Sequence, residues 1–161
     1  MGIACLILLI LTAGFGLFLA TIWLIEYDRD FQAATATRLP PPVLAGHALA
    51  AVAGLVLWIA YLIWGNHKLA WYSVIALLVA ATLGIFMGIR WIGVYRAKQT
   101  SARLAATMLA APVAATSSSS RTAAEGPPER NFPLPAVIIH GILAVTTLTL
   151  VLLTWLSVGG G

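Results

Sequence analysis

Long uninterrupted apolar stretches alternate along the chain with short segments that carry almost all of the polar and charged residues. Four of these stretches reach the roughly 20 residues that a helix needs to cross the hydrocarbon core of a bilayer, which is about 30 Å thick. A helix is expected there, because backbone polar groups in lipid must be satisfied within the segment itself. The expected fold class is therefore all-α, an integral membrane four-helix bundle. The pattern predicts spans at residues 3–25, 43–64, 69–89 and 135–158 of a single membrane domain, 1–161.

The composition excludes most classes of soluble protein. Hydrophobic residues make up 61% and charged residues 9% of the 161 positions, whereas a soluble domain carries roughly a quarter charged residues. A soluble enzyme, a nucleic-acid-binding module and a disulfide scaffold do not fit these values, and no hydrolytic or transferase motif is visible. The one cysteine, Cys5, lies in an apolar stretch and predicts no internal disulfide. The first apolar stretch lacks a basic segment before it and a small-residue cleavage site after it, so we expect it to be retained as a span.

The basic residues predict the orientation in the membrane. Cytoplasmic loops of membrane proteins carry an excess of Lys and Arg. Of the nine basic residues only Lys68 lies in the turn between the second and third spans, and the other eight lie toward the opposite side. We therefore expect a multi-pass protein of the plasma (inner) membrane, with both long loops cytoplasmic and both termini outside. The eight residues are Arg29, Arg38, Arg90, Arg96, Lys98, Arg103, Arg121 and Arg130.

Two interfacial features accompany these spans. Residues 97–132 are rich in Ala, Ser, Thr and Pro, a composition that cannot bury a core and predicts a flexible loop. Aromatic residues flank the turn at Lys68 and predict a belt at the outer membrane interface. They are Trp58, Tyr61, Trp64, Trp71 and Tyr72.

An internal repeat links the second and fourth spans. A shift of 93 residues aligns the starts of these spans and brings a Pro-x-Pro followed by a histidine into register. The aligned pairs are Pro40 with Pro133, Pro42 with Pro135 and His47 with His140. Two helical hairpins of the same topology would form a parallel repeat of the kind found in some membrane proteins.

The two histidines of this repeat are the candidate site. His47 and His140 lie at matching depth in the cytoplasmic half of their spans, and an imidazole there should face the bundle interior. A zinc or non-haem iron site needs three or four protein ligands, and no span carries an Asp or Glu well inside it. Haem needs only axial ligands, which two imidazoles supply. The candidate cofactor is therefore haem b, with His47 and His140 as ligands to its iron.

The residues around the pair are compatible with this hypothesis. The face that carries His47 continues through Ala50, Ala51 and Gly54, whose small side chains leave room for a macrocycle. Haem propionates need cations at the membrane edge. Arg90 is the best-placed candidate, because its planar guanidinium can pair with a carboxylate through two hydrogen bonds.

A structural interpretation of the same residues stays equally open. Histidines in spans can form hydrogen bonds between helices, and small residues pack helices with or without a cofactor. Two stripes of small residues predict such helix contacts, and His67 is expected to be a solvated residue of the outer turn. The stripes are Ala76, Ala80, Gly84 and Gly88 in the third span, and Ala13, Gly16 and Ala20 in the first.

With His47, His140 and four spans, the chain resembles the small four-helix membrane cytochromes b. The resemblance implies an electron-transfer protein with one bis-histidine haem, either alone or as one subunit of a respiratory or photosynthetic complex, with quinone or another redox subunit as its partner. The rival hypothesis is a non-catalytic structural or accessory subunit that packs against other membrane proteins, since nothing outside the bilayer is large enough to fold alone. A small transporter is a third class, but the spans lack the acidic residues and broken helices that transporters use.

Overall fold

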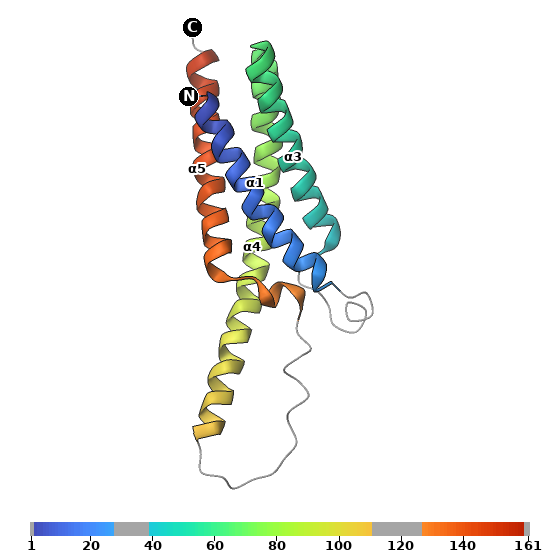
Figure 1. Ribbon diagram of the computed structural model, residues 1–161, viewed down its shortest axis with the longest axis vertical. Coiled ribbons are helices and arrows are strands. Elements are labelled where there is room, and N and C mark those ends of the chain that lie inside the picture. Colours follow the sequence, from blue (N-terminus) through green and yellow to red (C-terminus); the bar gives the residue numbers. More distant parts are fainter. Residues whose placement is uncertain (1, 28–38, 111–126, 160–161) are drawn as a thin grey trace.

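The computed structural model describes residues 2–27, 39–110 and 127–159. These residues form an all-α bundle, so the predicted fold class is confirmed (Figure 1). Four of its helices are long and apolar enough to cross a membrane, and the protein is a multi-pass membrane protein. The elements are α1 (Gly2–Ile25), α3 (Pro41–Trp64), α4 (His67–Ala110), the short 3-10 helix η1 (Pro128–Asn131) and α5 (Leu134–Gly159).

The helices run alternately up and down. The start of α1, the end of α5 and the turn between α3 and α4 lie at one end of the bundle, which we call the terminal end (Figure 1). The other end, where α1 finishes and α3 and α5 begin, is the loop end. The most extensive helix pairs are α3 with α4 and α1 with α5.

Proline and glycine set the boundaries of α3. The helix begins at Pro41, where a residue without an N–H loses no hydrogen bond. It ends before Gly65, whose φ of 64° is left-handed and whose N–H donates to the carbonyl of Tyr61 at 2.8 Å. Glycine adopts this conformation without the steric cost of a Cβ. The resulting short turn returns the chain directly into α4, antiparallel to α3.

Helix α4 is longer than the sequence predicted. It continues to Ala110, well past the expected end of the third span at residue 89, and so includes the first part of the expected flexible loop. The reason is that residues 94–110 contain no glycine or proline and are rich in Ala, Arg, Leu, Lys and Gln, which favour helix. At about 1.5 Å per residue, α4 is about 66 Å long, roughly twice the thickness of a hydrocarbon core.

Element η1 closes the loop end. The indole Nε1 of Trp91 donates to the backbone carbonyl of Glu129 at 3.1 Å, and Lys98 Nζ donates to the carbonyl of Arg130 at 3.0 Å. These contacts hold Pro128 and Glu129 fully buried against α1 and α4. The last part of the predicted loop is therefore structured, while residues 111–126 lie outside the described part of the chain.

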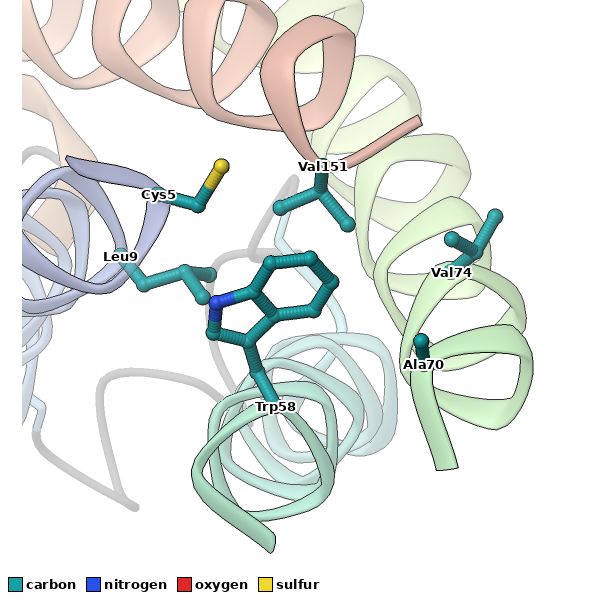
Figure 2. Close-up of a cluster of buried hydrophobic side chains, with 6 residues drawn as sticks. All are labelled: Cys5, Leu9, Trp58, Ala70, Val74 and Val151. Carbon is teal, nitrogen blue, oxygen red and sulfur yellow. The ribbon is translucent and has the colours of Figure 1, made fainter. Parts of the chain in front are cut away.

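The main hydrophobic core occupies the terminal half of the bundle. Figure 2 shows the indole of Trp58 extending from α3 into the space between the other helices, where it is fully buried. Its Nε1 donates to the carbonyl of Gly2 at 3.1 Å. Trp58 is thus a core residue, not the interfacial residue that the sequence predicted, whereas Trp64 is 71% exposed. The buried cluster is Cys5, Leu9, Trp58, Ala70, Val74 and Val151.

Most large apolar side chains point away from this core. Ile3, Leu17 and Leu49, for example, are 70–72% exposed. A surface of this kind is stable in contact with lipid and not in contact with water. Contact with the bilayer therefore accounts for the low burial of these helices.

Trp58→Ala is expected to lower the free energy of unfolding by about 3–5 kcal/mol, because it leaves a large cavity and removes the hydrogen bond to Gly2. Trp64→Ala, on the same helix, should change it by no more than about 0.5 kcal/mol. Reversible unfolding in mixed micelles would measure both. Equal losses in the two variants would contradict the assignment of Trp58 to the core.

Candidate functional site

The structure brings the two repeated histidines together. His47 lies six residues after the start of α3, and His140 lies six residues after the start of α5. Their ring centroids are 6.2 Å apart and the ring planes are inclined by 70°. Both side chains are half-buried. The expectation that the two rings lie at one depth and meet inside the bundle is confirmed.

Each imidazole is seated on a neighbouring helix. His47 Nδ1 is 2.8 Å from the carbonyl oxygen of Ala80 on α4. One helical turn further along α4, a Cβ added to Gly84 would lie 3.1 Å from Cε1 of the same ring. The ring therefore lies directly on the helix backbone, at a distance that only glycine allows without displacing it.

The second histidine repeats this arrangement on α1. His140 Nδ1 is 3.1 Å from the carbonyl oxygen of Thr12. A Cβ added to Gly16, again one turn further along, would lie 3.0 Å from Cε1 of His140. We call each such site a histidine seat: a backbone carbonyl that accepts from Nδ1 and a glycine four residues later that contacts the ring. Ala80 and Gly84 form the seat of His47, and Thr12 and Gly16 form the seat of His140. His140 of the second hairpin is thus seated on the first hairpin, and His47 of the first is seated on the second.

The hydrogen bonds fix which nitrogen carries the proton. A carbonyl oxygen can only accept, so Nδ1 of each ring must be the donor. In a neutral imidazole this leaves Nε2 with its lone pair available. Among the described residues neither ring makes a further hydrogen bond. A donor bond from Nδ1 to a backbone carbonyl is the usual support for a histidine that binds a metal through Nε2.

The two seats reveal a second register of the internal repeat. A shift of 68 residues aligns α1 with α4, and the matched residues are Gly16 with Gly84, Phe18 with Phe86, Trp23 with Trp91 and Tyr27 with Tyr95. The Trp–Tyr pairs are in ring contact in both places, with centroids 4.5 Å apart at the end of α1 and 5.2 Å apart on α4. The single shift of 93 missed this match, because the matched positions of the two helices are 25 residues further apart in the second hairpin than in the first.

The stripes of small residues serve a more specific purpose than the general helix contact that was predicted. Ala80, Gly84 and Gly16 form the histidine seats. Gly54, in contrast, does not leave space for a macrocycle. A Cβ there would lie 2.7 Å from Cδ2 of Leu77, so α4 fills that position. Ala51 and Ala144, one turn after each histidine, remain as small residues beside the pair.

Arg90 and His67 lie away from the histidine pair. Arg90 is exposed, with its Cζ 5.4 Å from the ring centroid of Phe86, and lies about 9 Å along α4 from Gly84 toward the loop end. Its role toward a propionate stays a prediction. His67 is the exposed first residue of α4 at the terminal end, with its ring centroid 6.3 Å from that of Tyr61. In the described ranges no three His, Cys, Asp or Glu residues are grouped closely enough to hold a metal ion.

One buried acidic residue was missed by the sequence analysis. Glu129 is fully buried at the loop end although it belongs to no span. Its position outside the apolar stretches gives no sign of this burial. The consecutive Pro127 and Pro128 before it were the available signal that this part of the loop is structured.

No protein-family model, curated protein or solved structure matches this chain. The site is therefore interpreted from its own geometry.

Gly16→Ala and Gly84→Ala are each expected to lower the free energy of unfolding by about 1–3 kcal/mol, because the added methyl group meets an imidazole that is held by its carbonyl. Gly14→Ala on α1 and Gly88→Ala on α4 are the matched controls, since their added Cβ atoms meet no atom within 4 Å. Unfolding in mixed micelles would measure the four variants. Equal stability of seat and control variants would show that the rings are not fixed on these glycines.

Proposed function

We propose that this protein is a b-type cytochrome-like electron-transfer protein of the membrane, which holds one haem between His47 and His140. The observation that carries the proposal is the pair of neighbouring imidazoles, each with Nδ1 bound to a backbone carbonyl. The spacing of the rings, the donor set and the rest of the chain support it.

The first argument is the spacing of the rings. A metal–imidazole bond is about 2 Å long, so two imidazoles on opposite sides of one metal place their ring centroids about 6 Å apart. The observed 6.2 Å agrees with this distance. An inclination of 70° between the planes is also compatible, because two rings can share a metal axis at any rotation about it.

The second argument is the chemistry of the donor set. Two neutral nitrogen donors without a carboxylate or thiolate are too few for a zinc or non-haem iron centre. They are sufficient for haem, whose porphyrin supplies the other four nitrogens. The haem supplies one-electron redox chemistry when it is bound.

The third argument is what the rest of the chain contributes. The carbonyls of Ala80 and Thr12 orient the rings and raise their basicity as ligands. The lipid-facing helices exclude water, which keeps the site in a low dielectric. Arg90 lies nearer the loop end than the histidines and is the candidate partner for a carboxylate at the membrane edge. Quinone or another redox subunit is the proposed electron partner.

A structural role is the second candidate, and the seats themselves favour it. Each Nδ1 bond joins two helices of different hairpins, which would stabilise the bundle without any cofactor. In that case the protein is an accessory subunit of a larger membrane complex. The length of α4 beyond a bilayer thickness gives such a subunit a surface for partners.

An absorption spectrum of the detergent-purified protein, recorded oxidised and then reduced with dithionite, distinguishes the two candidate functions. We expect a Soret band and a sharp reduced α-band. His47→Ala and His140→Ala should each abolish them while the chain still inserts into membranes, and added imidazole should restore part of the signal. His67→Ala is the control and should keep full pigment. A colourless protein after haem reconstitution, or full pigment in both single variants, would exclude the bis-histidine site.

The proposed orientation places the loop end in the cytoplasm and is tested in a Cys5→Ser background. A cysteine at Asn66 should react with an impermeant maleimide on intact cells, whereas a cysteine at Thr107 should react only after lysis. Both positions are exposed. The reverse pattern of labelling would invert the topology.

A further inference from the structure

One threonine of the bundle makes a hydrogen bond unlike all the others. In the described helices, eight threonine hydroxyls bond to the carbonyl four residues earlier in their own helix. They are Thr12, Thr21, Thr82, Thr100, Thr107, Thr146, Thr149 and Thr154. Bonding of this kind uses the hydroxyl hydrogen within one helix, although Thr154 Oγ1 also contacts Cys5 Sγ on α1 at 3.4 Å. Thr147 makes no such bond, and its hydroxyl instead contacts Thr12 on α1 at 3.1 Å.

The direction of this bond follows from the geometry. The hydroxyl of Thr12 donates its single hydrogen to the carbonyl of Leu8 at 2.7 Å. In the contact between the two hydroxyls, Thr147 must therefore be the donor and Thr12 Oγ1 the acceptor. Thr147 is 3% exposed, so no solvent competes for this bond. The bond joins Thr147 on α5 to Thr12 on α1, and the backbone carbonyl of Thr12 also accepts from His140.

The other seat lacks a bond between two side-chain hydroxyls. The shift of 93 residues aligns Thr147 with Gly54, and the shift of 68 aligns Thr12 with Ala80. There α3 and α4 are in direct contact, with Gly54 against Leu77 and the hydroxyl of Ser73 donating to the carbonyl of Gly54 at 2.8 Å. Beside the His47 seat, the two helices are thus joined by close packing and a bond from a hydroxyl to a backbone carbonyl. Beside the His140 seat, they are joined by a hydrogen bond between two side chains.

We propose that Thr147 is the positioning residue of His140. Its hydroxyl holds Thr12 of α1 at a fixed place against α5, and the carbonyl of Thr12 in turn fixes the imidazole of His140. His47 does not depend on Thr147. The two imidazoles are therefore held by unequal means, and the positioning can be measured with or without a cofactor. Its effect on a bound iron rests on the proposed function.

The test uses the full-length protein labelled with ¹⁵N-histidine, with ring resonances assigned from His47→Gln and His140→Gln. Thr147→Val removes the hydroxyl at almost constant volume and should shift the Nδ1 resonance of His140 but not that of His47. Thr147→Ser keeps a hydroxyl and should restore the wild-type resonance. Thr146→Val is the matched control, because its hydroxyl is exposed and bonds only to Ile142. An unchanged His140 in Thr147→Val, or equal shifts of both histidines, would overturn the proposal.

A second readout applies to haem-loaded protein. Thr147→Val should keep its pigment but change the electron paramagnetic resonance g-values and the midpoint potential, whereas Thr147→Ser and Thr146→Val should match the wild type. A wild-type protein that binds no haem would exclude the proposed function and leave the resonance test of Thr147 intact. A haem-loaded Thr147→Val variant with wild-type g-values, potential and resonances would exclude the positioning role alone.

Discussion

The fold and the site both depend on one constraint, which is that a polar group inside a bilayer must find its partner in the protein. Two imidazoles in apolar helices have no water to bind, so their Nδ1 atoms bond to the carbonyls of Ala80 and Thr12. Those bonds require close approach of ring and backbone, and Gly84 and Gly16 permit it. The contacts that hold the rings lie between the two most extensive helix pairs, α3 with α4 and α1 with α5.

The two hairpins, α1 with α3 and α4 with α5, satisfy this constraint in the same way for the imidazoles but with different supporting contacts. Each hairpin supplies a histidine to the other and receives one on a carbonyl and a glycine. Beyond this the two hairpins differ, since Gly54 packs closely where Thr147 forms a hydrogen bond. Different supporting contacts can hold an imidazole in a similar position. The positions of His47 and His140 are therefore more alike than the contacts that support them.

The sequence predicted what depends on hydropathy and spacing, and missed what depends on particular contacts. The four spans and the pairing of His47 with His140 follow from apolar length and a single shift, and both agree with the structure. Ligation by the pair and the role of Arg90 stay predictions. Trp58 was placed at the membrane interface because position along a helix does not reveal which side faces the core. The glycine seats could be found only with the second shift, and the burial of Glu129 required the path of the loop.

Because each hairpin holds the histidine of the other, the two histidines are bound at different times during synthesis of the chain. Helices α1, α3 and α4 are synthesised before α5. The carbonyl of Thr12 and the face of Gly16 therefore have no histidine bound until His140 is synthesised. His47, in contrast, meets Ala80 as soon as α4 follows α3 into the bilayer. The His47 seat can therefore form while the chain is still being elongated, and the His140 seat can form only after the second hairpin has been synthesised. Any ligand that needs both rings can enter only after that point.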